Sequence, residues 1–328
     1  VATLLTLKKH AKTIAQLLIL YTLAVPLSLL LIANAELLNR NIFMLVSVTL
    51  SLVIALASFI TGKLFKINSI LPVLLTTVMV LAVDLVTNLG LVKNSVMSYN
   101  IISGLRYYGL GNEYMGVMIG ATICFAAIFL HETSTRNKYF ITALLFCAVI
   151  FLIAYPLFGI NVGGTITASL GLGYTFIKFN KKNIHLRTIL YLILGTVILV
   201  GTMAIIDYNQ PAQLQSHLGR SMTMIINSGP TEILNIITRK IQMHIRIINY
   251  TIWGWIFLLA MLSFAYSIFK PLKPVKQFFA HAPLVYKGIQ GIIAASVIAV
   301  LFNDSGITAA AALALYLFSL FLYTRLYE

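Results

Sequence analysis

The sequence predicts an all-α fold, a polytopic transmembrane helical bundle of about ten spans, and three observations lead to it. Apolar residues make up 60% of the 328 positions and charged residues only 9%. The apolar residues gather in long segments, and a helix needs about 20 such residues to cross a bilayer. The 23 lysines and arginines lie mostly in the short stretches that join alternate segments.

The apolar segments are regular enough to be placed along the whole chain. We expect spans at 13–35, 42–62, 69–92, 114–131, 139–158, 163–177, 188–206, 250–269, 285–302 and 306–324. The sixth of these is short, which suits a helix that begins below the membrane surface. A re-entrant segment near 159–178 is the alternative for this part of the chain.

Basic residues orient the predicted spans, because short cytoplasmic loops carry an excess of lysine and arginine. An N-in, C-in arrangement places pairs such as Lys63 with Lys66 and Lys270 with Lys273 inside. The net charge of +15 lies mainly in these loops. Such charge favours attraction to anionic lipids and gives no reason to expect a nucleic-acid partner. We therefore expect a multi-pass protein of the cell membrane.

The organisation is that of a single integral membrane domain over residues 1–328, with an external segment at 207–249. The chain begins at Val1 and not at methionine, which is compatible with a longer protein that carries a second domain upstream. Cys124 and Cys147 fall within spans, where we expect small core residues and no disulfide. No cluster of histidines and cysteines predicts a metal site, and no cofactor is expected.

The third span contains two polar residues one helical turn apart, Asp84 and Asn88. A carboxylate within a span usually faces the interior of the bundle and marks a functional position. We therefore include Asp84 among the candidate substrate-binding residues. Arg106, in the next external loop, is a candidate ion-pair partner for it.

The external loop before the fourth span carries the most specific motif, which runs from Arg106 to Gly116. It combines Arg106, glycines that allow close backbone approach, and Asn112 and Glu113 where a helix enters the membrane. A carboxylate at a helix start is favoured by the helix dipole, so Glu113 as a simple first-turn charge is one interpretation. The other interpretation is catalytic, because ionisable groups at the edge of hydrocarbon are functional candidates.

A second external motif lies between the fifth and sixth spans, from Phe158 to Thr167. Asn161, Gly163 and Gly164 stand where a helix begins, and backbone amides at a helix start form a natural anion site. Close helix packing is the alternative, since glycine and threonine are common at helix interfaces in membranes. The sequence is compatible with both interpretations.

The external segment 207–249 is the only sizeable part of the chain outside the spans, and it predicts an amphipathic helix. Ser228-Gly229-Pro230 precedes a helix start, with Thr231 as a cap and Glu232 in the first turn. Isoleucines and leucine from there to Ile248 form an apolar side. Such a helix lies in the membrane interface with its basic residues toward lipid phosphates.

The basic residues of this segment have two interpretations. One is general anchoring to phospholipid. The other is a clamp on a pyrophosphate head group, because arginine matches phosphate oxygens in a bidentate geometry. The candidates for this clamp are Arg220, Arg239, Lys240 and Arg246.

The last external motif is Asn303-Asp304-Ser305-Gly306, between the ninth and tenth spans. These are ordinary turn residues, and a turn is the simpler interpretation. Asp304 is kept as a candidate substrate-binding residue because it is a carboxylate on the same side as the other motifs.

Taken in order, these motifs resemble a family of bacterial polytopic membrane proteins of unassigned function. The resemblance rests on the string from Arg106 to Gly116, the Asn161-Val162-Gly163-Gly164 turn, the Arg239-Lys240 helix leading to Trp253, and the Asn303 to Gly306 turn. It covers the chain from about residue 95 onward. Members of that family can carry an alkaline-phosphatase-like domain upstream, and the resemblance implies no established activity.

A second, weaker resemblance is to the O-antigen ligase and polymerase superfamily. The order and sidedness of the motifs are similar, and Arg106, Asn112 and Arg239 or Arg246 take the places of that superfamily's polar residues. The second motif of the superfamily typically contains an arginine, and the stretch from Asn161 to Gly164 has none. This difference weakens the transfer of its catalytic residues.

These observations lead to a functional hypothesis and two alternatives. The hypothesis is an external-face, metal-independent transferase acting on a polyprenyl-linked glycan or another lipid-linked precursor of the cell envelope. Glu113 would act as general base, Arg106 and Asn112 would orient the substrates, and the basic external residues would hold the diphosphate. The alternatives are a lipid or solute transporter, or flippase, and a membrane anchor for an upstream or partner extracellular enzyme domain.

Overall fold

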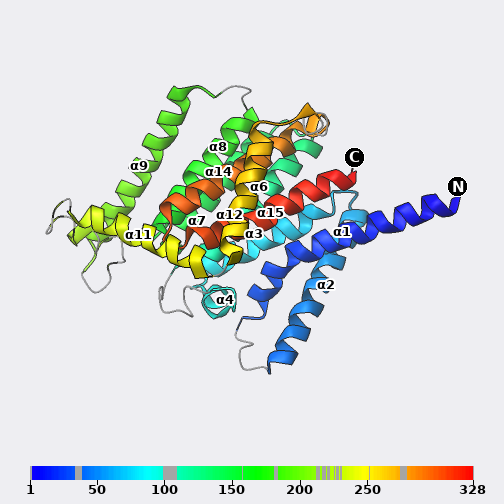
Figure 1. The fold of residues 1–328 in the computed structure, drawn as a ribbon, viewed down its shortest axis with the longest axis horizontal. Coiled ribbons are helices and arrows are strands. Elements are labelled where there is room, and N and C mark those ends of the chain that lie inside the picture. The colour runs from blue at the N-terminus through cyan, green and yellow to red at the C-terminus, as the bar shows by residue number, and fades with distance from the viewer. Residues whose placement is uncertain are drawn as a thin grey trace.

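The protein is a bundle of helices, seen in a computed structural model (Figure 1). The structure describes residues 2–33, 39–98, 109–156, 158–180, 184–211, 231–250, 252–273 and 279–327, together with 215, 219, 222–224, 226 and 229. Within these residues all regular secondary structure is helical. The prediction of an all-α bundle is therefore confirmed.

The helices follow the predicted apolar segments closely. In chain order they are α1 (Ala2–Leu31), α2 (Arg40–Leu64), α3 (Ile70–Val86), α4 (Gly90–Asn94), α6 (Asn112–Glu132), α7 (Lys138–Ala154), α8 (Val162–Asn180), α9 (Leu186–Tyr208), α11 (Thr231–Tyr250), α12 (Ile252–Phe269), α14 (Pro283–Phe302) and α15 (Gly306–Tyr327). Each of the ten predicted apolar segments overlaps one of these helices. The predicted amphipathic helix is α11, whose first residue is Thr231, the residue expected as its cap.

Six of these helices are long and apolar enough to cross a membrane: His10–Leu31 within α1, then α2, α6, α9, α14, and Gly306–Leu326 within α15. Three more are apolar but shorter, namely Ile70–Val86, Lys138–Ala154 and Trp255–Phe269. The chain is thus a multi-pass helical membrane protein. Both termini lie at the same end of the bundle (Figure 1).

Several predicted boundaries differ from the observed helix ends, and the backbone explains two of these differences. The third segment was expected to run to residue 92, but α3 ends at Val86 because Asn88 and Leu89 adopt positive φ angles of 75° and 60°. Left-handed residues cannot continue a right-handed helix. The fifth segment was expected to reach 158, but α7 ends at Ala154 because Tyr155 precedes a proline and is extended.

The centre of the bundle is α6, which packs against α3, α7, α8, α14 and α15. Its contact with α15 is close because two glycines of α6 face it. A Cβ atom added to Gly116 would lie 2.6 Å from the carbonyl oxygen of Ala309, and one added to Gly120 would lie 2.7 Å from the ring of Tyr316. Small residues thus set the distance between these helices, as is usual in membranes.

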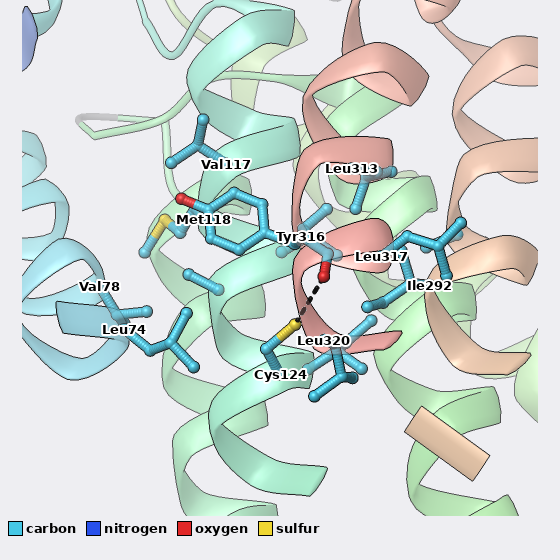
Figure 2. Close-up of a cluster of buried hydrophobic side chains, with 14 of the residues drawn as sticks. Leu74, Val78, Val117, Met118, Cys124, Ile292, Leu313, Tyr316, Leu317 and Leu320 are labelled. Carbon is cyan, nitrogen blue, oxygen red and sulfur yellow. Dashed lines mark hydrogen bonds between the residues drawn. The ribbon is translucent and has the colours of Figure 1, made fainter. Parts of the chain in front are cut away.

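A cluster of large apolar side chains fills the space around this contact (Figure 2). Tyr316 of α15 is fully buried there, and Figure 2 shows it among Val117, Met118 and Leu313. The thiol of Cys124 donates a hydrogen bond to the carbonyl oxygen of Tyr316 at 3.5 Å. Cys124 is therefore the small core residue that the sequence predicts.

Cys147 does not follow the same prediction, because it is exposed on α7. It lies on the same side of α7 as Phe140, Leu144 and Phe151, which are also exposed. These positions are three to four residues apart and form one helix face. An exposed face of large apolar residues on a membrane helix is the face that contacts lipid.

Candidate functional site

Polar residues from three separate segments meet at one end of the bundle, which we call the polar end. The segments are Leu110 to Glu113 before and at the start of α6, Asn161 to Gly164 at the start of α8, and Asn303 to Ser305 between α14 and α15. The chain termini lie at the opposite end, since α1 ends and α15 begins near the polar end. The three motifs that the sequence places on one side are therefore brought together.

Asn112, the first residue of α6, connects all three segments. Its side-chain amide donates to the hydroxyl of Ser305 at 2.7 Å, and its Oδ1 accepts from the Nδ2 of Asn161 at 3.3 Å. Asn161 Nδ2 also donates to the carbonyl oxygen of Leu110 at 2.8 Å. Because these groups are buried, the network fixes the relative positions of the starts of α6, α8 and α15.

Asn161 also caps α8. Its Oδ1 accepts a hydrogen bond from the amide of Gly164 at 2.7 Å, and its carbonyl oxygen accepts from the amide and the hydroxyl of Thr165. An asparagine at this position satisfies amides that a helix start otherwise leaves unpaired. The amide of Gly164 is thus engaged by the protein itself.

The glycines of this turn allow α8 to approach the α14–α15 turn. A Cβ atom on Gly163 would lie 2.4 Å from Oδ1 of Asn303, whose Nδ2 donates to Thr167 at 2.9 Å. One on Gly164 would lie 2.8 Å from Cγ of Asn161. These contacts support the packing interpretation of Gly163 and Gly164.

Glu113 follows Asn112 in the first turn of α6 and is buried, with 6% of its surface exposed. An added Cβ at Gly111 would lie 3.0 Å from Oε2 of Glu113, so the carboxylate sits against the backbone just before the helix. The start of the helix stabilises negative charge. Burial of a carboxylate otherwise costs free energy, and a buried carboxylate is therefore a strong candidate for a chemical role.

Tyr114, in the first turn of α6, connects the start of this helix to α1 through Ser95. Its hydroxyl is 2.6 Å from the hydroxyl of Ser95, which donates to the carbonyl oxygen of Leu29 in α1 at 2.9 Å. All of Tyr114 is buried. The sequence alone assigns no role to Tyr114 or Ser95, and it indicates only turn residues at Asn303 and Ser305. The signal that could have identified all four residues is a hydroxyl or amide side chain at the end of an apolar segment.

Asp84 has a local structural partner. Its two carboxylate oxygens accept hydrogen bonds from the amides of Leu91 and Val92 at 2.8 and 2.9 Å. Asp84 is buried and thereby holds the short helix α4 against the end of α3. Its predicted partner Arg106 lies outside the described residues, so that pairing stays a prediction.

Helix α11 lies across the polar end at a steep angle to the bundle (Figure 1). It is attached there by Lys240, whose Nζ donates to the carbonyl oxygen of Phe302 at 2.7 Å and lies 3.5 Å from Oδ1 of Asp304. Arg239 and Arg246 are exposed on a different face. Arg220, the remaining candidate of this segment, lies outside the described residues.

The apolar side of α11 faces away from the bundle. Leu234, Ile237, Ile241 and Ile245 recur every three or four residues and have between 48% and 65% of their surface exposed. A helix with an exposed aliphatic face and an exposed basic face is typical of the membrane interface.

The chemistry available at the polar end is that of carboxylate, amide, hydroxyl and basic groups. No group of three or more histidines, cysteines, aspartates or glutamates that could hold a metal ion occurs in the described part of the chain. The arrangement can accept a proton at Glu113 and bind anions at α11.

The described residues thus define a multi-pass helical membrane protein with a group of buried polar side chains at the polar end. Comparisons with protein-family models, curated proteins and solved structures find no match for this chain.

Proposed function

We propose that this protein is a membrane-embedded transferase that acts on a lipid-linked precursor of the cell envelope, such as a polyprenyl-diphosphate-linked glycan. The proposal rests on one observation above all: the buried carboxylate of Glu113 is connected to a basic interfacial helix. Asn112 binds Ser305, and the neighbouring Asp304 pairs with Lys240 of α11. The proposed proton acceptor and the proposed phosphate-binding helix thus belong to one assembly.

In the proposed reaction, the oxygen of an acceptor hydroxyl forms a bond with the anomeric carbon of the donor sugar. The bond between that carbon and the diphosphate oxygen breaks, and the polyprenyl diphosphate leaves. Glu113 takes the proton of the acceptor hydroxyl. Arg239 and Arg246, with Arg220, stabilise the negative charge of the leaving diphosphate. Arg106 orients donor and acceptor, and Asn112 positions the start of α6 that carries Glu113.

The location of the polar groups favours a transferase over the transporter alternative. Substrate sites of secondary transporters usually lie near the middle of the membrane. Here the Asn112, Asn161 and Asn303 side chains lie at the ends of helices, and the carboxylate of Asp84 is engaged by two amides. The basic loops at the opposite end favour an external location for the polar end.

The test is turnover by Glu113→Gln in proteoliposomes that contain a polyprenyl-diphosphate-linked sugar as donor and a glycan with a free hydroxyl as acceptor, with release of polyprenyl diphosphate as the readout. We expect loss of about 10²- to 10⁴-fold in rate, the usual contribution of general base catalysis. Glu132→Gln is the matched control, because Glu132 ends the same helix at the opposite end of the bundle. Full turnover by Glu113→Gln would refute the assigned base, and no release of polyprenyl diphosphate by the wild type would refute the transferase.

A further inference from the structure

The ion pair between Lys240 and Asp304 joins α11 to the α14–α15 turn. Its atoms are 3.5 Å apart, and the two side chains have 30% and 63% of their surface exposed. Exposed ion pairs contribute little to stability, because water and salt compete for both partners. Asp304 can therefore leave Lys240 when another anion arrives, while the hydrogen bond from Lys240 to Phe302 keeps the ammonium in place.

Positive charge is in excess around this pair. Arg239 precedes Lys240, and Arg246 lies two helical turns further along the face that carries Arg239, about 10 Å away at 1.5 Å per residue. Asp304 is the single carboxylate that the structure places within ion-pair distance of Lys240 among the described residues. A ligand with several negative charges would match this part of α11 better than one carboxylate does.

The orientation of α11 brings such a ligand to the right depth. The exposed aliphatic face, with Leu234, Ile237 and Ile241, fixes the helix at the level of lipid head groups. The ammonium of Lys240 is held at the same level by the turn that follows α14. A diphosphate carried on a membrane lipid lies at that level too.

We propose that Asp304 is a resident counter-ion that the diphosphate head group of the lipid-linked substrate displaces from Lys240. This inference rests on the proposed function and identifies its anion subsite as Lys240 together with Arg239. It also reverses the role expected for Asp304, which competes with the substrate and does not bind it. Ser305 is the next residue, so departure of Asp304 acts on the turn that holds Asn112 and, through it, the start of α6.

The first experiment is calorimetric titration of the detergent-solubilised protein with inorganic pyrophosphate. Asp304→Asn removes the competing charge at nearly constant shape, and we expect it to lower the dissociation constant by roughly threefold to tenfold, as expected when one screened charge is removed. Lys240→Met should raise the dissociation constant by a similar factor. Asp304→Glu keeps the charge and should bind as the wild type does.

Three outcomes would overturn the inference: unchanged or weaker pyrophosphate binding by Asp304→Asn, unchanged binding by Lys240→Met, or no binding by any variant. Thermal unfolding of each variant shows whether the protein is folded. If Lys240→Met does not fold, Asp304→Asn and Asp304→Glu alone decide, since they retain Lys240.

A second measurement separates a lipid head group from free pyrophosphate. Native mass spectrometry of the protein from nanodiscs that contain polyprenyl diphosphate should show more retained lipid for Asp304→Asn than for wild type. If Asp304→Asn binds pyrophosphate more tightly but does not retain more lipid, the proposal that the displacing diphosphate belongs to a membrane lipid is contradicted. The result is independent of turnover by Glu113→Gln, so failure of the subsite and failure of the proposed reaction are distinguishable.

Discussion

The side-chain amide of Asn112 donates a hydrogen bond to the hydroxyl of Ser305 at 2.7 Å, across 193 positions of the chain. It joins the first residue of α6 to the turn that precedes α15. Both side chains are buried, so this bond is shielded from water.

Asn112→Ala should destabilise the protein by about 1 to 3 kcal/mol, because it removes the two buried hydrogen bonds that join Asn112 to Ser305 and to Asn161. The free energy of unfolding can be measured by titration with sodium dodecyl sulfate in bicelles. Asn180→Ala is the control, since Asn180 is exposed and its side chain donates to a carbonyl oxygen of its own helix at 2.9 Å. Equal effects of the two substitutions would contradict the structural role of Asn112.

Gly116→Ala should separate α6 from α15. The new Cβ would lie 2.6 Å from a backbone oxygen, which cannot move as a side chain can. We expect a loss of about 1 to 3 kcal/mol in unfolding free energy, as for other overpacked cores. Gly195→Ala in α9 meets nothing within 4 Å and should be neutral or stabilising, because alanine favours helix more than glycine. Equal losses at both positions would show that packing at Gly116 is not limiting.

Asp84→Ala should release α4, because the amides of Leu91 and Val92 lose their acceptors. We expect Asp84→Asn to have a smaller effect, since one carbonyl oxygen remains to accept a hydrogen bond. Hydrogen exchange of the amides of Leu91 and Val92, followed by mass spectrometry, measures this directly. Unchanged exchange in Asp84→Ala would exclude the capping role.

Arg239→Ala combined with Arg246→Ala should reduce the retention of anionic lipid on the purified protein, measured by native mass spectrometry. The wild-type association should weaken as ionic strength rises, because the two side chains are exposed and their charges are screened by salt. Lys63→Ala combined with Lys66→Ala is the control, since these exposed lysines lie at the opposite end. Equal retention by both double variants would contradict a specific role for α11.

The sequence predicts the helices well, because long apolar segments carry that information residue by residue. It also predicts the start of α11, where the Ser228-Gly229-Pro230 stretch precedes Thr231. It fails at the ends of α3 and α7, where local backbone conformation overrides hydropathy. A count of apolar residues does not reveal that Asn88 and Leu89 have left-handed backbone angles.

The candidate site is only partly predictable for a different reason. Asn112, Asn161 and Asp304 stand out as polar residues at segment ends, yet the partners that hold them lie on other helices. The bonds from Asn112 to Ser305 and from Lys240 to the α14–α15 turn depend on which helices are neighbours. Periodicity shows which face of a helix is apolar, but it does not show which helix that face meets.

The burial of α6 restricts how a substrate can reach Glu113. Neighbouring helices surround α6 along almost its whole length, so membrane lipid does not touch it. A hydrocarbon chain cannot slide along this helix toward the carboxylate. A lipid-borne molecule must stay at the outside of the bundle and extend its head group over the helix ends, where α11 lies. The protein would then accept only donors whose head group is long enough to reach from the outside of the bundle to Glu113.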